Sequence, residues 1–100
     1  MIGKFEELAL LALVRAGPDA YAAQVYKELE KNMQKAPQFS ALYTTLDRMA
    51  KKGMVKESSS TDDKNRRLFT ISGAGRQALN ESLGATQALG GFLVPGPVGA

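Results

Sequence analysis

The sequence predicts a mainly α-helical domain that contains one small β-hairpin. Four segments repeat apolar residues at three- and four-residue steps, which is the spacing of one helix face. Two shorter segments are predicted to be strands, because they flank a small polar stretch that cannot bury anything. A chain of 100 residues suffices for one domain with a single modest core.

The composition is ordinary for a globular protein and argues against catalysis. The chain has no Cys and no His, which removes thiolate metal sites and the commonest general base. The adjacent carboxylates Glu6–Glu7 and Asp62–Asp63 lie in segments expected to be exposed, not converging in a pocket. We therefore expect no enzyme activity, no cofactor, no metal site and a cytoplasmic location. No segment reaches the roughly 18 to 20 apolar residues that cross a bilayer.

The first predicted helix, Gly3–Ala16, is apolar on nearly every side. One small core cannot easily cover all of its faces, so we expect a second subunit to cover part of it. Phe5, Leu8 and Leu11 are its candidate dimer-interface residues. The following Gly-Pro pair ends this helix, and Asp19 is expected to cap the next.

The second predicted helix, Ala20–Met33, carries a broad apolar stripe. We interpret Tyr21 and Tyr26 as core or rim residues of this stripe, not as ligand-binding residues. Residues 32–37 form the turn that follows, where Pro37 prevents a continuous helix.

The third predicted helix, Gln38–Lys52, has two distinct faces. Its apolar face comprises Phe39, Leu42, Leu46 and Met49. Its opposite face is small and polar at the start and basic at the end: Ser40, Thr44, Asp47, Arg48 and Lys51. This layout favours a helix whose back packs into a core while its front lies in a DNA groove. Gln38 is a poor N-cap, so either Ser40 caps the helix or its first turn is looser. Gly53 ends the helix.

The predicted strands, Met54–Glu57 and Arg66–Ile71, enclose an exposed polar hairpin tip. Basic residues gather here and on the preceding helix. Between Arg48 and Arg76 there are eight basic and three acidic residues, a local excess of five positive charges. Such an excess suits contact with a polyanion, although a solvated basic face is the ordinary alternative.

The last predicted helix, Gly73–Leu89, is capped by Ser72 and has an apolar surface that its own domain does not need. We assign its Leu79 and Leu83 to the dimer interface. Its interior glycines, Gly75 and Gly84, weaken it by roughly 1 kcal/mol each relative to alanine. The remaining tail, residues 90–100, is expected to be flexible, with apolar residues that could dock on a partner: Phe92, Leu93 and Val94.

Three stretches of the chain carry a family resemblance. ALYTTLDRMAKKGMV, beginning at Ala41, resembles the recognition helix of the PadR family of winged helix-turn-helix transcriptional regulators. FEELALLALVRAGPDAYAAQVYKEL resembles the first two helices of that family, and NRRLFTISGAGRQAL its second wing strand and the start of its last helix. Together these stretches cover roughly Phe5 to Leu79, in the family's order.

The resemblance implies a winged helix-turn-helix domain in residues 1–72, with three helices and a two-stranded wing. It further implies a C-terminal dimerisation helix in residues 73–89 and a tail in residues 90–100. The expected protein is a homodimeric regulator, most often a repressor, that reads an inverted-repeat operator in double-stranded DNA. Family members are often released from DNA by a small molecule, so an effector between the subunits is an open expectation.

The candidate DNA-binding residues lie on the third helix and the wing. They are Gln38, Ser40, Tyr43, Thr44, Arg48, Lys51, Lys64, Arg66 and Arg67. The hydroxyl-bearing residues are nearest the base edges, and the basic residues are expected at phosphates or in the minor groove.

Several roles stay open. Tyr43 either reads bases or packs under the helix, and Arg48 either meets a phosphate or pairs with an acid on a neighbouring helix. Asp62 and Asp63 either cap the hairpin or hold the wing at the edge of the groove. A winged-helix module that binds protein and not DNA is the alternative function, because a fold does not fix a function.

Overall fold

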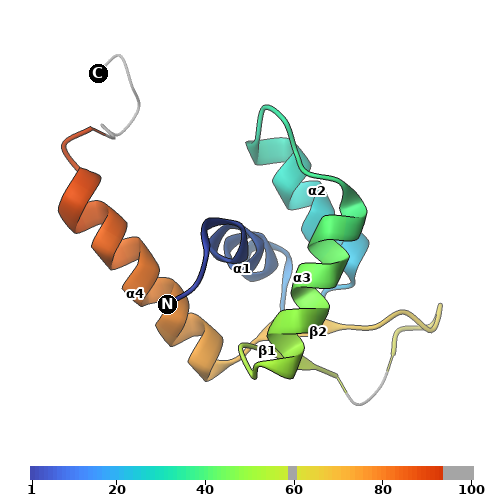
Figure 1. Cartoon of the computed structure of the whole chain (residues 1–100). Coiled ribbons are helices and arrows are strands. Elements are labelled where there is room, and N and C mark those ends of the chain that lie inside the picture. The colour runs from blue at the N-terminus through green and yellow to red at the C-terminus, as the bar shows by residue number, and fades with distance from the viewer. Residues whose placement is uncertain (59–60, 94–100) are drawn as a thin grey trace.

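The computed structural model describes residues 1–58 and 61–93. The elements, in chain order, are α1 (Lys4–Ala16), α2 (Ala22–Asn32), α3 (Phe39–Lys51), β1 (Val55–Glu57), β2 (Phe69–Ile71) and α4 (Gly73–Gly90). The two strands pair antiparallel, with Val55 opposite Ile71. Figure 1 shows α1 between the α2–α3 pair on one side and α4 on the other. The predicted fold class, a mainly helical winged helix-turn-helix, is confirmed.

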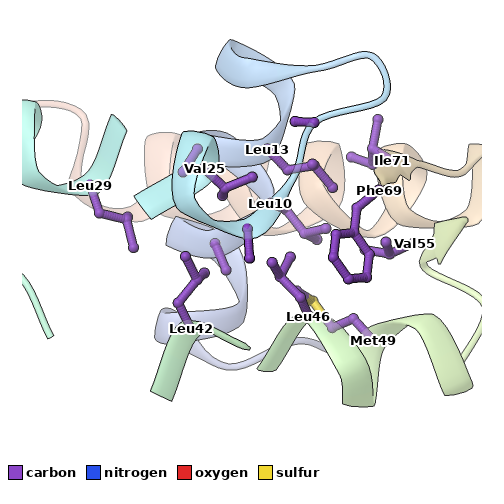
Figure 2. Close-up of a cluster of buried hydrophobic side chains, with 14 of the residues drawn as sticks. Leu10, Leu13, Val25, Leu29, Leu42, Leu46, Met49, Val55, Phe69 and Ile71 are labelled. Carbon is purple, nitrogen blue, oxygen red and sulfur yellow. The ribbon is translucent and has the colours of Figure 1, made fainter. Parts of the chain in front are cut away.

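The hydrophobic core lies where α1, α2, α3 and β2 meet (Figure 2). Leu10 and Leu13 of α1 pack against Val25 of α2, Leu46 of α3 and Phe69 of β2. All five side chains are almost completely buried. The largest of them, the Phe69 ring, brings the wing strand into the same core as the helices, so the core orients the wing relative to α3.

The segment between α1 and α2 differs from the prediction. Asp19 is not the N-cap of α2; Tyr21 holds that position, and its N–H donates to Gln24 Oε1 at 3.0 Å. Asp19 instead has a positive φ of 53°, and its N–H donates to Thr70 Oγ1 at 2.9 Å. The neighbouring Ala20 pairs with Phe69 through two backbone hydrogen bonds. The chain before α2 is therefore bound to the wing strand, which delays the start of the helix.

The ends of α3 agree with the prediction only in part. Gly53 has the positive φ, 82°, expected of a residue that ends a helix. At the other end the N-cap is Gln38, without a side-chain capping bond, so Ser40 does not cap the helix. Phe39, predicted on the apolar face, is 40% exposed. It lies in the first turn, beyond the edge of the core, where its ring meets Tyr26 edge-on at 5.5 Å. Thr45 takes a buried position that the apolar pattern did not include.

The second strand is shorter than predicted, since β2 begins at Phe69 and not at Arg66. Its partner β1 has only three residues, and beyond this pair the Ser58 N–H donates to the Leu68 carbonyl at 2.9 Å. Arg66 and Arg67 therefore lie in the wing arm that leads into β2.

The start of α4 is fixed against the turn between α3 and β1. The Ser72 hydroxyl accepts from the Gly75 N–H at 3.0 Å, as its predicted capping role requires. The same hydroxyl donates to the Gly53 carbonyl at 2.6 Å. A Cβ placed on Gly75 would lie 2.0 Å from the Met54 carbonyl oxygen, so only glycine allows this close approach. One of the two glycines predicted to weaken the helix is thus required by its packing.

A buried carboxylate joins α4 to α1. Glu7 has a side chain that is only 5% exposed, and Ser82 of α4 donates its hydroxyl to Glu7 Oε1 at 2.5 Å. Lys4, one turn away, donates to the other carboxylate oxygen at 3.0 Å. These two hydrogen bonds, the one from Ser82 first, hold the pKa of Glu7 below its ordinary value against the opposing effect of burial.

The C-terminal part of α4 projects away from the rest of the molecule (Figure 1). The helix runs one residue past the predicted end, and Leu89 near its end is 82% exposed. The predicted flexible tail begins inside this helix at Gly90, and its residues 94–100, including Val94, lie outside the described residues. None of the helices in residues 1–58 and 61–93 is long and apolar enough to span a membrane.

The two interior glycines of α4 should respond oppositely to alanine. Gly75→Ala places a methyl group against the Met54 carbonyl and should lower the free energy of unfolding by about 1–3 kcal/mol or more. Gly84→Ala meets no atom within 4 Å and should raise it by about 0.5–1 kcal/mol through helix propensity. Urea unfolding followed by circular dichroism measures both. Equal effects of the two substitutions would contradict the close approach at Gly75.

Ser82→Ala should lower the free energy of unfolding, relative to wild type, by more at pH 7 than at acid pH. Because the folded-state pKa of Glu7 is lowered, its ionised form contributes stability above the unfolded value of about 4.5. That contribution disappears as the pH falls through the folded pKa. Losing the Ser82 hydrogen bond should cost about 1–3 kcal/mol at pH 7, and the difference should shrink below pH 4.5.

Thr86→Ala, on the exposed surface of the same helix, is the matched control for Ser82→Ala. Urea unfolding at a series of pH values should show no comparable loss for this variant. If Ser82→Ala lowered the free energy of unfolding equally at pH 3 and pH 7, the contribution of this hydrogen bond to stability would not depend on the charge of Glu7.

Candidate nucleic-acid interface

The outward face of α3 carries small polar and basic side chains. Ser40, Thr44 and Lys51 are all exposed, on the side of the helix opposite the buried Leu42 and Leu46. This follows from the 3.6-residue period, which separates the two sets by about half a turn. Gln38, the N-cap, is also exposed at the tip of the helix. A row of donors and acceptors is thus presented along one side of α3.

The wing approaches α3 through Arg67. Its Nε and Nη2 donate to the two carboxylate oxygens of Glu57, on β1, at 2.8 and 2.7 Å. Nη2 also donates to Asp47 Oδ1 at 3.0 Å, and Nη1 donates to Tyr43 Oη at 3.1 Å, both on α3. The bonds to Glu57 above all, and then that to Tyr43, raise the pKa of Arg67 above its ordinary value. This guanidinium therefore links the hairpin to α3.

The pKa values of the two acids around Arg67, Asp47 and Glu57, are shifted in the opposite direction. Hydrogen bonds from Lys51, first, and Arg67 lower the pKa of Asp47, and those from Arg67 lower that of Glu57. Lys51 lies 3.2 Å from Asp47 along the same helix. Two predicted DNA-binding cations, Lys51 and Arg67, thus share one carboxylate in the free protein.

The wing tip is organised by Asp62. Its Oδ1 accepts from the backbone N–H groups of Lys64 and Arg66, at 3.0 and 2.8 Å, and its Oδ2 binds Arg66 Nε at 2.7 Å. Asn65 adopts a positive φ of 60°, which completes the turn. Asp62 therefore takes the hairpin-capping role that the sequence left open. Its pKa is lowered chiefly by the Arg66 backbone N–H.

Arg66 extends from the wing arm to the start of α2. Its guanidinium carbon is 3.5 Å from the centre of the Tyr21 ring, a cation–π contact. Lys64, by contrast, has an exposed ammonium group that makes no ion pair within the described ranges 1–58 and 61–93. Of the three wing residues predicted to bind DNA, Lys64, Arg66 and Arg67, only Lys64 has no carboxylate partner among the described residues.

Arg48 faces the flank of α3 nearest α1. It lies 3.7 Å from Glu6, which is also 3.5 Å from Lys52. The salt-bridge alternative for Arg48 is therefore present, in a half-exposed geometry that contributes little to stability. Hydrogen bonding to the Gly3 backbone, together with these two cations, lowers the pKa of Glu6.

An open hollow of about 280 Å³ separates α3 from the wing. Its lining includes Tyr21, Phe39 and Tyr43 together with Arg66 and Arg67. Tyr21 and Phe39 were not among the predicted site residues. The four-residue spacing of Phe39 and Tyr43 was the available signal, since it places both rings on one flank of the helix.

The predicted dimer-interface residues divide into two groups. Phe5, Leu8, Leu11 and Leu83 are half-buried in the single chain. Leu79 is already buried in the core of its own chain and offers little surface to a partner. The part of the chain that the structure describes contains no group of three or more His, Cys, Asp or Glu side chains able to hold a metal ion.

Several solved structures share this fold, and two of them are named as a transcription regulator and a transcription factor. A PadR family transcription regulator from Clostridium difficile matches with a TM-score of 0.74 and 17% identity, over 91% of this chain and 95% of that one. A PadR-like transcription factor from Bacteroides fragilis matches with 0.71 and 21%, over 89% and 85%. RosR of H. salinarum matches with a TM-score of 0.71 and 24% identity, over 87% of this chain and 76% of that one. At these identities the likeness establishes the fold.

The family is established by sequence. No curated protein is similar enough to this chain to count as a match. The model of the transcriptional regulator PadR-like family, however, matches residues 10–81. This is most of the chain, from the second half of α1 through α2, α3 and the wing to the first half of α4. The chain therefore belongs to the PadR-like family of transcriptional regulators, proteins that bind DNA and are not enzymes.

Proposed function

We propose that this regulator is a homodimeric repressor that reads an inverted-repeat operator with α3 and its wing. The observation that carries this proposal is the outward face of α3, where Ser40, Thr44 and Lys51 are exposed beside the basic wing. A helix of this kind fits the major groove, and a basic hairpin beside it fits the adjoining backbone. Repression needs no further surface, because a protein bound at an operator blocks access to it.

Base reading falls to the first half of α3 on this proposal. Gln38, Ser40, Tyr43 and Thr44 lie within two turns of its N-terminus, the end that enters the groove in helix-turn-helix proteins. Their hydroxyl and amide groups can both donate and accept, and the Thr44 methyl group can contact a thymine methyl.

Phosphate contact falls to the basic residues on either side. Lys64 is the strongest candidate, because its ammonium is exposed and makes no ion pair within residues 1–58 and 61–93. Arg48, Lys51 and Arg66 are held by Glu6, Asp47 and Asp62 respectively, and each would exchange a carboxylate for a phosphate on binding. Such exchanges make binding depend on salt less steeply than the number of basic residues suggests.

Dimerisation would use α1 and α4. Phe5, Leu8, Leu11 and Leu83 are only half-buried by their own chain, and the exposed apolar end of α4 extends the same surface. A two-fold dimer would place two recognition helices roughly 34 Å apart, one turn of DNA, and so require an inverted repeat.

A small-molecule effector is proposed at the α4 surface. An open hollow of about 290 Å³ lies between the N-terminus and α4, lined by Met1, Ile2, Ala78, Ser82 and Ala85 among others. A second subunit packed on α4 would enclose it further. The DNA partner also supports the expected cytoplasmic location.

Selection from random duplex DNA should enrich an inverted repeat. Fluorescence anisotropy of the enriched duplex should show affinity that falls steeply as salt rises, because phosphates are neutralised. Repeating the assay with planar phenolic and drug-like compounds tests the effector, and a panel without any change in affinity would argue against it. Weak binding with no enriched sequence would favour the alternative module that binds protein.

Lys64→Ala should weaken binding to all duplexes alike and reduce the salt slope by about one per protomer. The reason is that Lys64 is proposed to contact a phosphate, which carries no sequence information. Lys27→Ala is the control, because Lys27 is also exposed but lies on α2 beside Arg15 and Glu28, away from the wing. A Lys64→Ala loss confined to particular sequences would contradict the phosphate contact.

A further inference from the structure

Arg67 is engaged too fully to serve as a simple phosphate contact. Four of the five guanidinium N–H groups are used, two on Glu57, one on Asp47 and one on Tyr43. Both carboxylates are thus in contact with this guanidinium, and Asp47 also pairs with Lys51. A phosphate oxygen that approached Arg67 would also come close to both carboxylates. The Arg67 side chain, moreover, is only 30% exposed. Arg67 therefore acts mainly on the side chains that it contacts within the protein.

Among the side chains that Arg67 contacts, Tyr43 is the one whose hydroxyl it orients. Its phenolic oxygen is conjugated with the ring, so its proton lies in the ring plane on one side and its acceptor lone pair on the other. Arg67 Nη1 occupies the acceptor side at 3.1 Å. The proton is thereby turned to the opposite side. In the part of the chain that the structure describes, no side chain or backbone group accepts it.

The Tyr43 ring is also held in place. Phe39 packs against it at 6.2 Å between ring centres, and the Arg67 guanidinium lies 5.5 Å from its centre. The residue is 38% exposed and stands next to Thr44 on the first half of α3. Its hydroxyl is thus an oriented donor at the edge of the surface proposed to enter the groove.

We propose that Arg67 is a positioning residue that fixes Tyr43 as a hydrogen-bond donor to a base edge, and so makes this position of the operator disfavour cytosine. Guanine, adenine and thymine all present an acceptor in the major groove, whereas cytosine presents only an amino donor. A hydroxyl free to rotate would accept from that amino group, but one held by Arg67 does not. This inference rests on the proposed DNA-binding function.

Two substitutions test it on the duplex enriched by wild type. Each base of a half-site is replaced in turn by cytosine, with its partner, and affinity is measured by anisotropy. For wild type, one position should lose roughly 2- to 10-fold, the value of one net hydrogen bond, through the Tyr43 contact. Tyr43→Phe keeps the ring and should abolish that discrimination. Arg67→Lys keeps the charge and should weaken it, because the released hydroxyl can then accept from cytosine. Neither variant should change the salt slope.

Tyr26→Phe is the matched control. Tyr26 also packs on Phe39, but its hydroxyl donates to the Pro37 carbonyl at 2.7 Å within the protein. This variant should keep the discrimination against cytosine. Melting curves verify the fold of every variant. If Arg67→Lys unfolds, Arg67→Met, which also removes the donor to Tyr43 Oη, takes its place with the same expected loss of discrimination.

Two results would overturn the inference while leaving the DNA-binding function intact. One is a Tyr43→Phe loss that is equal for every sequence, which would place the hydroxyl on a phosphate. The other is an Arg67→Lys variant that keeps full discrimination against cytosine. A wild-type protein that enriches no sequence would overturn the proposed function, and this inference with it.

Discussion

The Ser72 hydroxyl joins the three parts of the molecule that have to act together. It accepts from the first turn of α4 and donates to the Gly53 carbonyl at the end of α3, while the Ser72 N–H binds the Met54 carbonyl at the start of the wing. Gly75 allows the helix to come close enough for these bonds to form. Because the recognition helix, the wing and α4 all meet at this point, a change there alters the relation among all three.

The charges of the candidate interface are largely compensated before DNA arrives. Glu6, Asp47 and Asp62 each hold one or more of the basic residues that the sequence assigned to phosphates. An acid next to a basic residue lowers affinity for any polyanion, and it does so most where no base contact offsets the cost. The carboxylates thus favour discrimination between sequences over strength of binding, which suits a regulator that has to find one site among many.

Local sequence patterns predicted what depends on near neighbours. The apolar period gave the existence of each helix, and Ser72 and Gly53 were identified because capping involves residues within one turn. The polar hairpin gave the position of the wing. These elements were sufficient, with the family resemblance, to predict the fold class.

What the sequence could not predict depends on contacts between distant residues. Asp19 was expected to cap α2, but it binds Thr70, 51 residues away. Arg67 was expected at a phosphate, although its partners in the free chain lie 10 to 24 residues away. Gly75 was expected to weaken a helix, since nothing local reveals that the Met54 carbonyl lies against it. Phe39 followed the apolar period but lies beyond the edge of the core.

If the proposed dimer packs on the projecting half of α4, the folding of this half depends on the amount of protein present. Every residue from Gly84 to Leu89 is exposed, so the chain itself offers this stretch almost no packing. Helical segments of this length are marginal in water without a packing partner. The fraction of molecules in which these last turns are helical would then increase with dimerisation. At low protein concentration the chain would be monomeric, and this end of the helix would be frayed. The helical content of the end of α4 would therefore depend on the concentration of the protein in the cell.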